Sequence, residues 1–213
     1  MPLYTTDALI LRTYKLGESD RIVVFLTRDR GKKRGVAKNA RQSRRRFGGA
    51  LEPMTAGRVG YFERERRDLV SLNFVEPIRS PLAAPDGDAL GYVGYFAELI
   101  DEWAQEADPN EALYRLGASV IEAMAEGVAI EPLARYFEYW LLRLQGVYEQ
   151  GARLSGEARA FLAAARDVSP FALRSVSVSG RALRELESAH RGLIAVHLEK
   201  ELKSVRVLRE MRR

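Results

Sequence analysis

The sequence of 213 residues contains no cysteine and only two histidines. Without a thiol, the chain cannot form disulfides, thiolate zinc sites, iron–sulfur clusters or a cysteine nucleophile. No apolar run approaches the ~18 residues that a membrane-spanning helix needs. The first residues also lack the basic-then-apolar order of a secretory signal. These absences predict a globular cytoplasmic protein that does not enter a membrane.

Sequence motifs for catalysis are also missing. Neither the phosphate-binding pattern G-x-x-x-x-G-K-[ST] nor G-x-G-x-x-G occurs, so no nucleotide-hydrolysis loop is expected. Ser19 lies between Glu18 and Asp20, but no histidine is near in sequence, which favours a role in a turn over a nucleophile. His190 and His197 are seven residues apart, whereas two metal ligands on one helix need a spacing of three or four. We therefore expect no enzyme, no metal site and no cofactor.

The net charge of +5 conceals a strong asymmetry along the chain. Residues 1–80 contain 18 Lys and Arg against 9 Asp and Glu, a net charge of +9. Residues 81–149 contain 3 against 13 (−10), and residues 150–213 contain 13 against 7 (+6). Positions 28–46 alone hold ten basic residues and one acid. Such a basic block is typical either of an arm that binds polyanions or of a solvated loop.

The spacing of apolar residues divides the chain into two domains, a strand-rich domain over residues 1–80 and a helical domain over residues 81–213. Short apolar runs bounded by turn residues predict five strands, the last two paired in a hairpin with Arg66, Arg67 and Asp68 at its tip. Five short strands in about 75 residues are typical of a small closed or half-closed barrel. The predicted strands cover residues 8–13, 21–27, 32–37, 57–65 and 69–76.

The period of the apolar residues becomes helical after Pro77, Pro81 and Pro85. Asp108 and Pro109 resemble an N-cap and the first residue of a new helix. The aromatic residues around Trp140 are expected to pack the helical core. The pattern thus predicts an α+β fold, with helices at 88–107, from 108 to about 126, from about 132, at 155–166 and 169–176, and as one last helix from about 181.

Basic residues on the third predicted strand and the connection after it are the strongest functional feature. A strand and a flexible loop with this charge can follow a phosphate backbone and release its counterions. On a small barrel, this favours nucleic-acid binding over an inert loop. Strand periodicity does not say which aromatic residues face outward to stack on bases, so six candidates stay open: Tyr14, Phe25, Phe47, Tyr61, Phe62 and Phe74.

Five segments in the first part of the chain form a recognisable pattern: Ala8–Thr13, Gly17–Val23, Thr27–Lys32, Gly35–Arg41 and Ser43–Pro53. These segments resemble the bacterial RecO family of recombination and repair mediators. The agreement is nearly unbroken over positions 8–53. At the other end, His197 and Leu198 with Leu202-Lys203-Ser204 and Leu208 resemble the terminal helix of the family, whereas 81–180 is similar only in helical pattern and length.

The resemblance implies an N-terminal OB-fold and a C-terminal helical domain. It further implies a nucleoid-associated protein that binds single- and double-stranded DNA and anneals complementary strands. The implied partners are RecR and the single-strand-binding protein, the implied task is loading of the recombinase RecA, and the family has no catalytic residues. Phosphate-binding roles carry over to Arg28, Lys32, Lys38, Arg41, Arg44, Arg45 and Arg46, and Lys33 and Arg34 join them on charge alone.

One stretch departs from the family pattern. Many members carry a four-cysteine, zinc-finger-like motif after a leucine-rich helix that ends in Gly-Tyr. Here the corresponding residues 141–148 lead directly into residues 149–155, and neither stretch contains a cysteine. We therefore expect this chain to have no zinc finger and to hold the region without metal.

Composition alone leaves two other functions open. The first is an RNA-binding OB-fold factor, because RNA and DNA present the same phosphates, and competition between single-stranded DNA and RNA separates the two. The second is a protein-interaction scaffold with an inert basic loop, which would elute early from heparin or DNA. A nuclease is least favoured, because the sequence lacks a metal-binding cluster.

Overall fold

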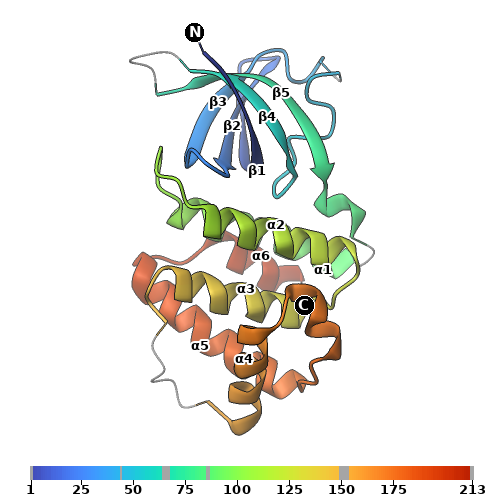
Figure 1. The fold of residues 1–213 in the computed structure, drawn as a ribbon, viewed down its shortest axis with the longest axis vertical. Coiled ribbons are helices and arrows are strands. Elements are labelled where there is room, and N and C mark those ends of the chain that lie inside the picture. Colours follow the sequence, from blue (N-terminus) through green and yellow to red (C-terminus); the bar gives the residue numbers. More distant parts are fainter. Residues whose placement is uncertain (1, 44, 64–67, 85–86, 149–153, 212–213) are drawn as a thin grey trace.

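Five strands come first in the structure and close into a barrel. The structure is a computed structural model that describes residues 2–43, 45–63, 68–84, 87–148 and 154–211. The barrel order β1-β2-β3-β5-β4 confirms the predicted five-stranded barrel (Figure 1). The strands are β1 (Leu3–Leu16), β2 (Asp20–Thr27), β3 (Lys32–Ala37), β4 (Ala56–Phe62) and β5 (Val70–Arg79). β4 and β5 form the predicted antiparallel hairpin, although residues 66 and 67 of its expected tip lie outside the described residues.

The first strand starts earlier than its residue pattern predicts. Leu3–Leu9 pair with β4, in register from Leu3 opposite Phe62 to Leu9 opposite Ala56. The second half of β1 pairs with β2, and a register shift falls between Ile10 and Arg12. The first residues thus become a strand because of a partner more than 40 positions away, which local alternation does not reveal.

Both faces are buried over residues 8–11 of β1 and 23–27 of β2, each face against a different core. Ala8 and Ile10 point into the barrel, whereas the alternating Leu9 and Leu11 join the core of the helical part. On β2, Phe25 lies inside the barrel and its neighbours face the helices. A strand that is covered on both sides has a continuous apolar sequence, and this explains the runs that marked these strands.

Helices form the rest of the described chain and, with the barrel, confirm the α+β class. In Figure 1, α1 and α2 lie between the barrel and the remaining helices. α2 packs closely on the barrel, because a Cβ placed on Gly117 of α2 would lie 2.6 Å from the Leu9 side chain of β1. In the part of the chain that the structure describes, no helix is long and apolar enough to cross a bilayer. The helices are α1 (Gly87–Trp103), α2 (Glu111–Ala125), α3 (Ile130–Leu144), α4 (Gly156–Asp167), α5 (Gly180–Leu198) and α6 (Lys203–Met211).

The predicted start of α2 and the predicted type of the helix at 169–176 are wrong. The N-cap of α2 is Asn110, whose side chain accepts a hydrogen bond from Leu113 N at 2.9 Å, so Asp108 and Pro109 precede the helix. Just before them, Gln105 and Ala107 hydrogen-bond to Lys32 of β3, so this part of the chain runs along the barrel before α2 begins. The predicted helix at 169–176 is a 3₁₀ helix, η2 (Pro170–Ser175), and a similar short turn, η1 (Pro81–Ala83), follows β5.

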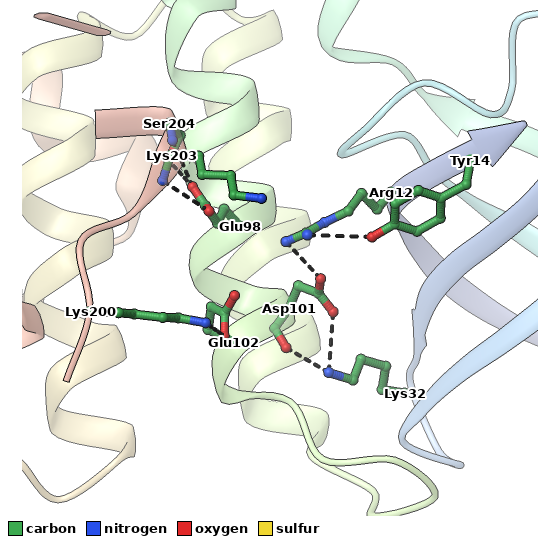
Figure 2. A network of polar contacts seen from close by, with 9 residues as sticks. All are labelled: Arg12, Tyr14, Lys32, Glu98, Asp101, Glu102, Lys200, Lys203 and Ser204. Carbon is green, nitrogen blue, oxygen red and sulfur yellow. Dashed lines mark hydrogen bonds and ion pairs between the residues drawn. The ribbon is translucent and has the colours of Figure 1, made fainter. Parts of the chain in front are cut away.

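The predicted single C-terminal helix is also wrong, because it is two helices. α5 ends at Leu198, and the next residue, Glu199, adopts a left-handed conformation with φ of 52°. α6 then begins where Glu98 of α1 accepts hydrogen bonds from Lys203 N at 3.1 Å and Ser204 N at 2.8 Å (Figure 2). A carboxylate at this position satisfies amides that the start of a helix leaves unpaired. The break therefore depends on a side chain about 100 residues away.

The pKa of Glu98 reports this contact. Burial opposes the charge, but the hydrogen bonds from the Ser204 hydroxyl and amide and from the Lys203 amide outweigh burial and lower the pKa below its ordinary value of 4.5. The folded chain therefore releases this proton more readily than the unfolded chain does. The contact stabilises the fold above pH 4.5, and the stabilisation is lost as the pH falls through the lowered pKa.

Substitution of Glu98→Gln should flatten the acid dependence of stability. The unfolding free energy of the wild type falls as the pH drops below about 4.5, because the unfolded carboxylate then binds a proton first. The glutamine side chain does not titrate, so the unfolding free energy of the variant should fall less over the same pH range. At neutral pH, the variant should be less stable than the wild type. Urea unfolding at a series of pH values measures both, and identical pH profiles would contradict the assignment.

Candidate nucleic-acid interface

Lys32, a predicted phosphate contact, is bound to the helical part. Its backbone N donates to Gln105 O and its O accepts from Ala107 N, both at 3.1 Å. Its Nζ donates to Asp101 O at 2.6 Å and lies 3.2 Å from Asp101 Oδ1. Asp101 Oδ2 also pairs with Arg12 of β1 at 2.9 Å, so one carboxylate joins two strands to α1 (Figure 2). With its side chain only 15% exposed, Lys32 is engaged within the fold.

Three further predicted phosphate contacts also form ion pairs with carboxylates. The Lys33 side chain is 13% exposed, whereas those of Arg28 and Arg34 are about half exposed. One of the three carboxylates belongs to α2 and another to the segment before it. The two pairs that they form lie at the junction between the barrel and the helices. The pairs are Arg28 with Glu111 at 2.7 Å, Lys33 with Glu63 at 2.8 Å and Arg34 with Glu106 at 3.8 Å.

The remaining predicted cations lie on the connection between β3 and β4, residues 38–55. Arg46 donates to Lys38 O at 2.7 Å, and Arg41 donates to Glu18 O at 3.1 Å, so both guanidinium groups hold backbone carbonyls. Lys38, Arg41 and Arg45 are exposed. Within the described residues, none of these four cations pairs with a carboxylate. Arg44, the ninth predicted contact, lies outside the described residues.

Packing against the barrel holds this connection in place. The Phe47 side chain is 1% exposed and belongs to the barrel core together with Ala50 and Leu51. Arg46 O accepts from Val75 N of β5 at 2.9 Å. At the other end of the connection, Asp20 accepts from Asn39 N at 2.8 Å. The cations are therefore presented by a segment anchored at several points over one end of the barrel, with few degrees of freedom to lose on binding.

The six aromatic residues that could stack on bases differ in how exposed they are in the structure. Phe25, Phe47 and Tyr61 are buried at 0–1% exposure, and burial raises the pKa of Tyr61 to about 12. Phe62 and Phe74 are partly buried. Tyr14 is 46% exposed and lies on the outer side of β1. Of the six, Tyr14 therefore has the most ring surface available to a base.

Neither histidine is placed as a metal ligand. His190 Nδ1 lies 3.0 Å from Glu138 Oε2 in the helical core, and His197 stacks on Trp103. Burial opposes the charge of Glu138, but Arg135 and hydrogen bonds from neighbouring side chains lower its pKa. Among the residues described, no group of three or more His, Cys, Asp or Glu side chains could hold a metal. Residues 149–153, where we expect the chain to lack a zinc finger, lie outside the described residues.

Family models match most of the chain. The model described as "Recombination protein O N terminal" matches residues 1–81, and "Recombination protein O C terminal" matches residues 84–150. The first match ends two residues after β5, so it contains the whole barrel together with the β3–β4 connection. The second contains α1, α2 and α3.

Curated relatives carry the same family name. The "DNA repair protein RecO" of Koribacter versatilis is 44% identical over 148 residues, which cover 68% of this chain and 59% of the relative. That of Anaeromyxobacter sp. (strain K) is 39% identical over 141 residues, covering 65% of this chain and 55% of the relative. The chain thus spans less than two thirds of these two proteins. That of Geobacter metallireducens is 31% identical over 240 aligned positions, covering 97% of both.

Because Lys32 is bound within the fold whereas the cations of the β3–β4 connection are not paired with described carboxylates, we predict that Lys32→Ala lowers the stability of the protein. The variant would leave Asp101 partly buried with one cation fewer, which costs about 1–3 kcal/mol. Arg45→Ala removes the same charge from an exposed site with no described carboxylate partner and should change stability by less than about 0.5 kcal/mol. Urea unfolding at neutral pH compares the two, and equal losses would show that Lys32 is not a junction residue.

Proposed function

This chain belongs to the RecO family of DNA repair proteins, and from this premise we propose that it is a non-enzymatic recombination mediator. It binds single- and double-stranded DNA, anneals complementary single strands and, together with RecR, helps to load the recombinase RecA. The single-strand-binding protein is a further partner, since the DNA to be loaded is coated with it. The protein acts in the cytoplasm, in association with the nucleoid, and requires no cofactor.

The observation that carries the proposal is the anchored, positively charged connection on the barrel. Lys38, Arg41, Arg45 and Arg46 lie within nine residues of one another and have no described carboxylate partner. Exposed cations of this kind neutralise phosphates and release counterions, which supports binding that does not depend on sequence. Phosphate contacts leave the base edges free, as pairing with a complementary strand requires.

The ion pairs at the junction between the barrel and the helices limit where a DNA phosphate can bind. Arg28, Lys32 and Arg34 face carboxylates of the helical part, and a phosphate would have to displace these carboxylates to bind there. Lys38 and Arg45 require no such exchange. We therefore place the principal phosphate contacts on the β3–β4 connection and assign the junction cations to joining the barrel and the helices.

The C-terminal segment offers a place for a second strand. Residues 150–213 carry a net charge of +6, and Arg159, Arg181, Arg184 and Arg206 are exposed on α4, α5 and α6. Annealing needs two strands held by one protein or by two copies of it. The exposed arginines of these three helices suit the second strand.

Two matched double variants test the assignment of the phosphate contacts. Lys38→Ala/Arg45→Ala should weaken binding to DNA of any sequence and reduce the slope of log K against log salt by about 1.4 for a single strand. Arg28→Ala/Arg34→Ala removes the same charge and should change the slope much less, because these cations are already paired. Fluorescence anisotropy across a salt series gives both slopes, and equal reductions would contradict the division.

Strand annealing tests the function itself. The wild-type protein should accelerate pairing of complementary strands, with and without bound single-strand-binding protein, and Lys38→Ala/Arg45→Ala should slow it. No acceleration by the wild type would reject the mediator. Stronger binding to RNA than to single-stranded DNA of equal length would favour the RNA-binding factor, and early elution from heparin would favour the scaffold.

A further inference from the structure

A row of side chains crosses the outer face of three strands. Tyr14 of β1 lies opposite Ile22 of β2, which lies opposite Val36 of β3. Residues directly opposite one another in antiparallel strands point to the same side of the sheet. The next residues along β2 and β3, Val23 and Ala37, are completely buried inside the barrel. Tyr14, Ile22 and Val36 therefore point outward.

The covered part of this face ends one row before Tyr14. The preceding row consists of Arg12, Val24 and Arg34. Val24 is 5% exposed within the core shared with the helices. In the next row the exposure rises to 46% at Tyr14, and Ile22 and Val36 are half-buried. The three side chains thus form an apolar surface with an aromatic ring at one end, beside the junction with α1.

The phenol ring is held from the junction side. Arg12 Nη1 donates to Tyr14 Oη at 3.4 Å, while Arg12 Nη2 pairs with Asp101 of α1 at 2.9 Å. Figure 2 shows this chain of contacts from α1 through Arg12 to the ring. A ring restrained in this way loses little freedom when a ligand stacks on it.

Basic residues border the row along β3. Arg34 lies two residues before Val36, and Lys38 lies two residues after it. Beyond Lys38, Arg41 is held against the β1–β2 turn by its bond to Glu18 O. Acids are also present in this turn, and Asp20, which accepts from Asn39 N at 2.8 Å, is already engaged. Cations along one edge of an apolar row are complementary to phosphates along one edge of a row of bases.

We infer that Tyr14, with Ile22 and Val36 beside it, is a base-stacking surface for single-stranded DNA. The inference rests on the proposed function and extends it, because it assigns the bases to the β1–β3 face and the phosphates to Lys38 and its neighbours. The occupant is a single strand, since the bases of a duplex are already stacked on each other and present no free ring face. Stacking is tolerant of sequence, because every base has a ring face.

Replacement of the Tyr14 ring distinguishes the contribution of base stacking to DNA affinity from that of charge. Tyr14→Leu should weaken binding to a single strand of thymidines by about 5- to 150-fold. It should leave the salt slope, the affinity for duplex DNA and the affinity for an abasic strand unchanged. Tyr14→Phe keeps the ring and should stay within about twofold of the wild type. Fluorescence anisotropy with the three DNA forms measures all of these affinities.

The outcomes distinguish this inference from the function on which it rests. An unchanged affinity of Tyr14→Leu for the thymidine strand, or an equal loss on the abasic strand, would overturn the stacking surface. If Lys38→Ala/Arg45→Ala still loses affinity in the same assay, DNA binding itself stands. A wild type that binds no single strand would instead reject the proposed function.

Photocrosslinking of the unmodified protein provides a second measurement that does not depend on a variant folding. A single strand with 5-iodouracil in place of thymine reacts on irradiation with an aromatic ring stacked on the base. Mass spectrometry of the wild-type adduct should locate the crosslink at Tyr14. A crosslink confined to aromatic residues outside the β1–β3 face would overturn the inference.

Discussion

The carboxylate of Asp101 binds two cations from different strands of the barrel, Arg12 at 2.9 Å and Lys32 at 3.2 Å. Glu98 lies one helical turn before Asp101 on α1. It caps α6, whereas Asp101 contacts the barrel (Figure 2). Glu102 adds a pair with Lys200 at 2.5 Å. The acidic edge of a single helix thus joins the barrel to the C-terminal helices. Because several contacts meet at Asp101 and at Glu98, removal of one partner leaves the carboxylate with part of its charge uncompensated.

This constraint changes the meaning of the charge pattern. A segment of net charge −10 following one of +9 predicts a molecule with separate acidic and basic faces. In the fold, Asp101, Glu106 and Glu111 face cations of the barrel, so much of the opposite charge meets at the junction. Outside the junction, Lys38, Arg41, Arg45 and Arg46 lie close together in sequence on the β3–β4 connection. Net charge per segment therefore overstates the acidic surface and understates how local the basic surface is.

Local sequence patterns were sufficient for much of the fold, because strand and helix periods depend on neighbouring residues. They predicted the barrel, the β4–β5 hairpin and the positions of most helices. They missed the first residues of β1, which pair with β4, and the end of α5, where neither glycine nor proline marks the break at Glu199. Both depend on contacts distant in sequence.

The candidate site shows the same limit. The sequence identified nine cations but not their partners, since Arg28 meets Glu111 across 83 positions and Lys32 meets Asp101 across 69. It also offered six aromatic residues without saying which face outward. That choice depends on barrel closure, which buries Phe25 and Tyr61 and leaves Tyr14 on the outside. Residue type was thus predictable, whereas availability to a ligand required the three-dimensional fold.

A buried ion pair is weak support for stability when considered alone, because desolvation opposes the attraction. Burial likewise lowers the pKa of Arg12, whereas the charge of Asp101 raises it. The net result is a raised pKa of Arg12. The value of this pair lies in the geometry that it imposes. The guanidinium that Asp101 holds also donates to Tyr14, so the contact that joins the barrel to α1 continues to an exposed aromatic ring. The junction and the outer face of β1–β3 therefore form one arrangement, in which a shift of α1 would move the ring as well.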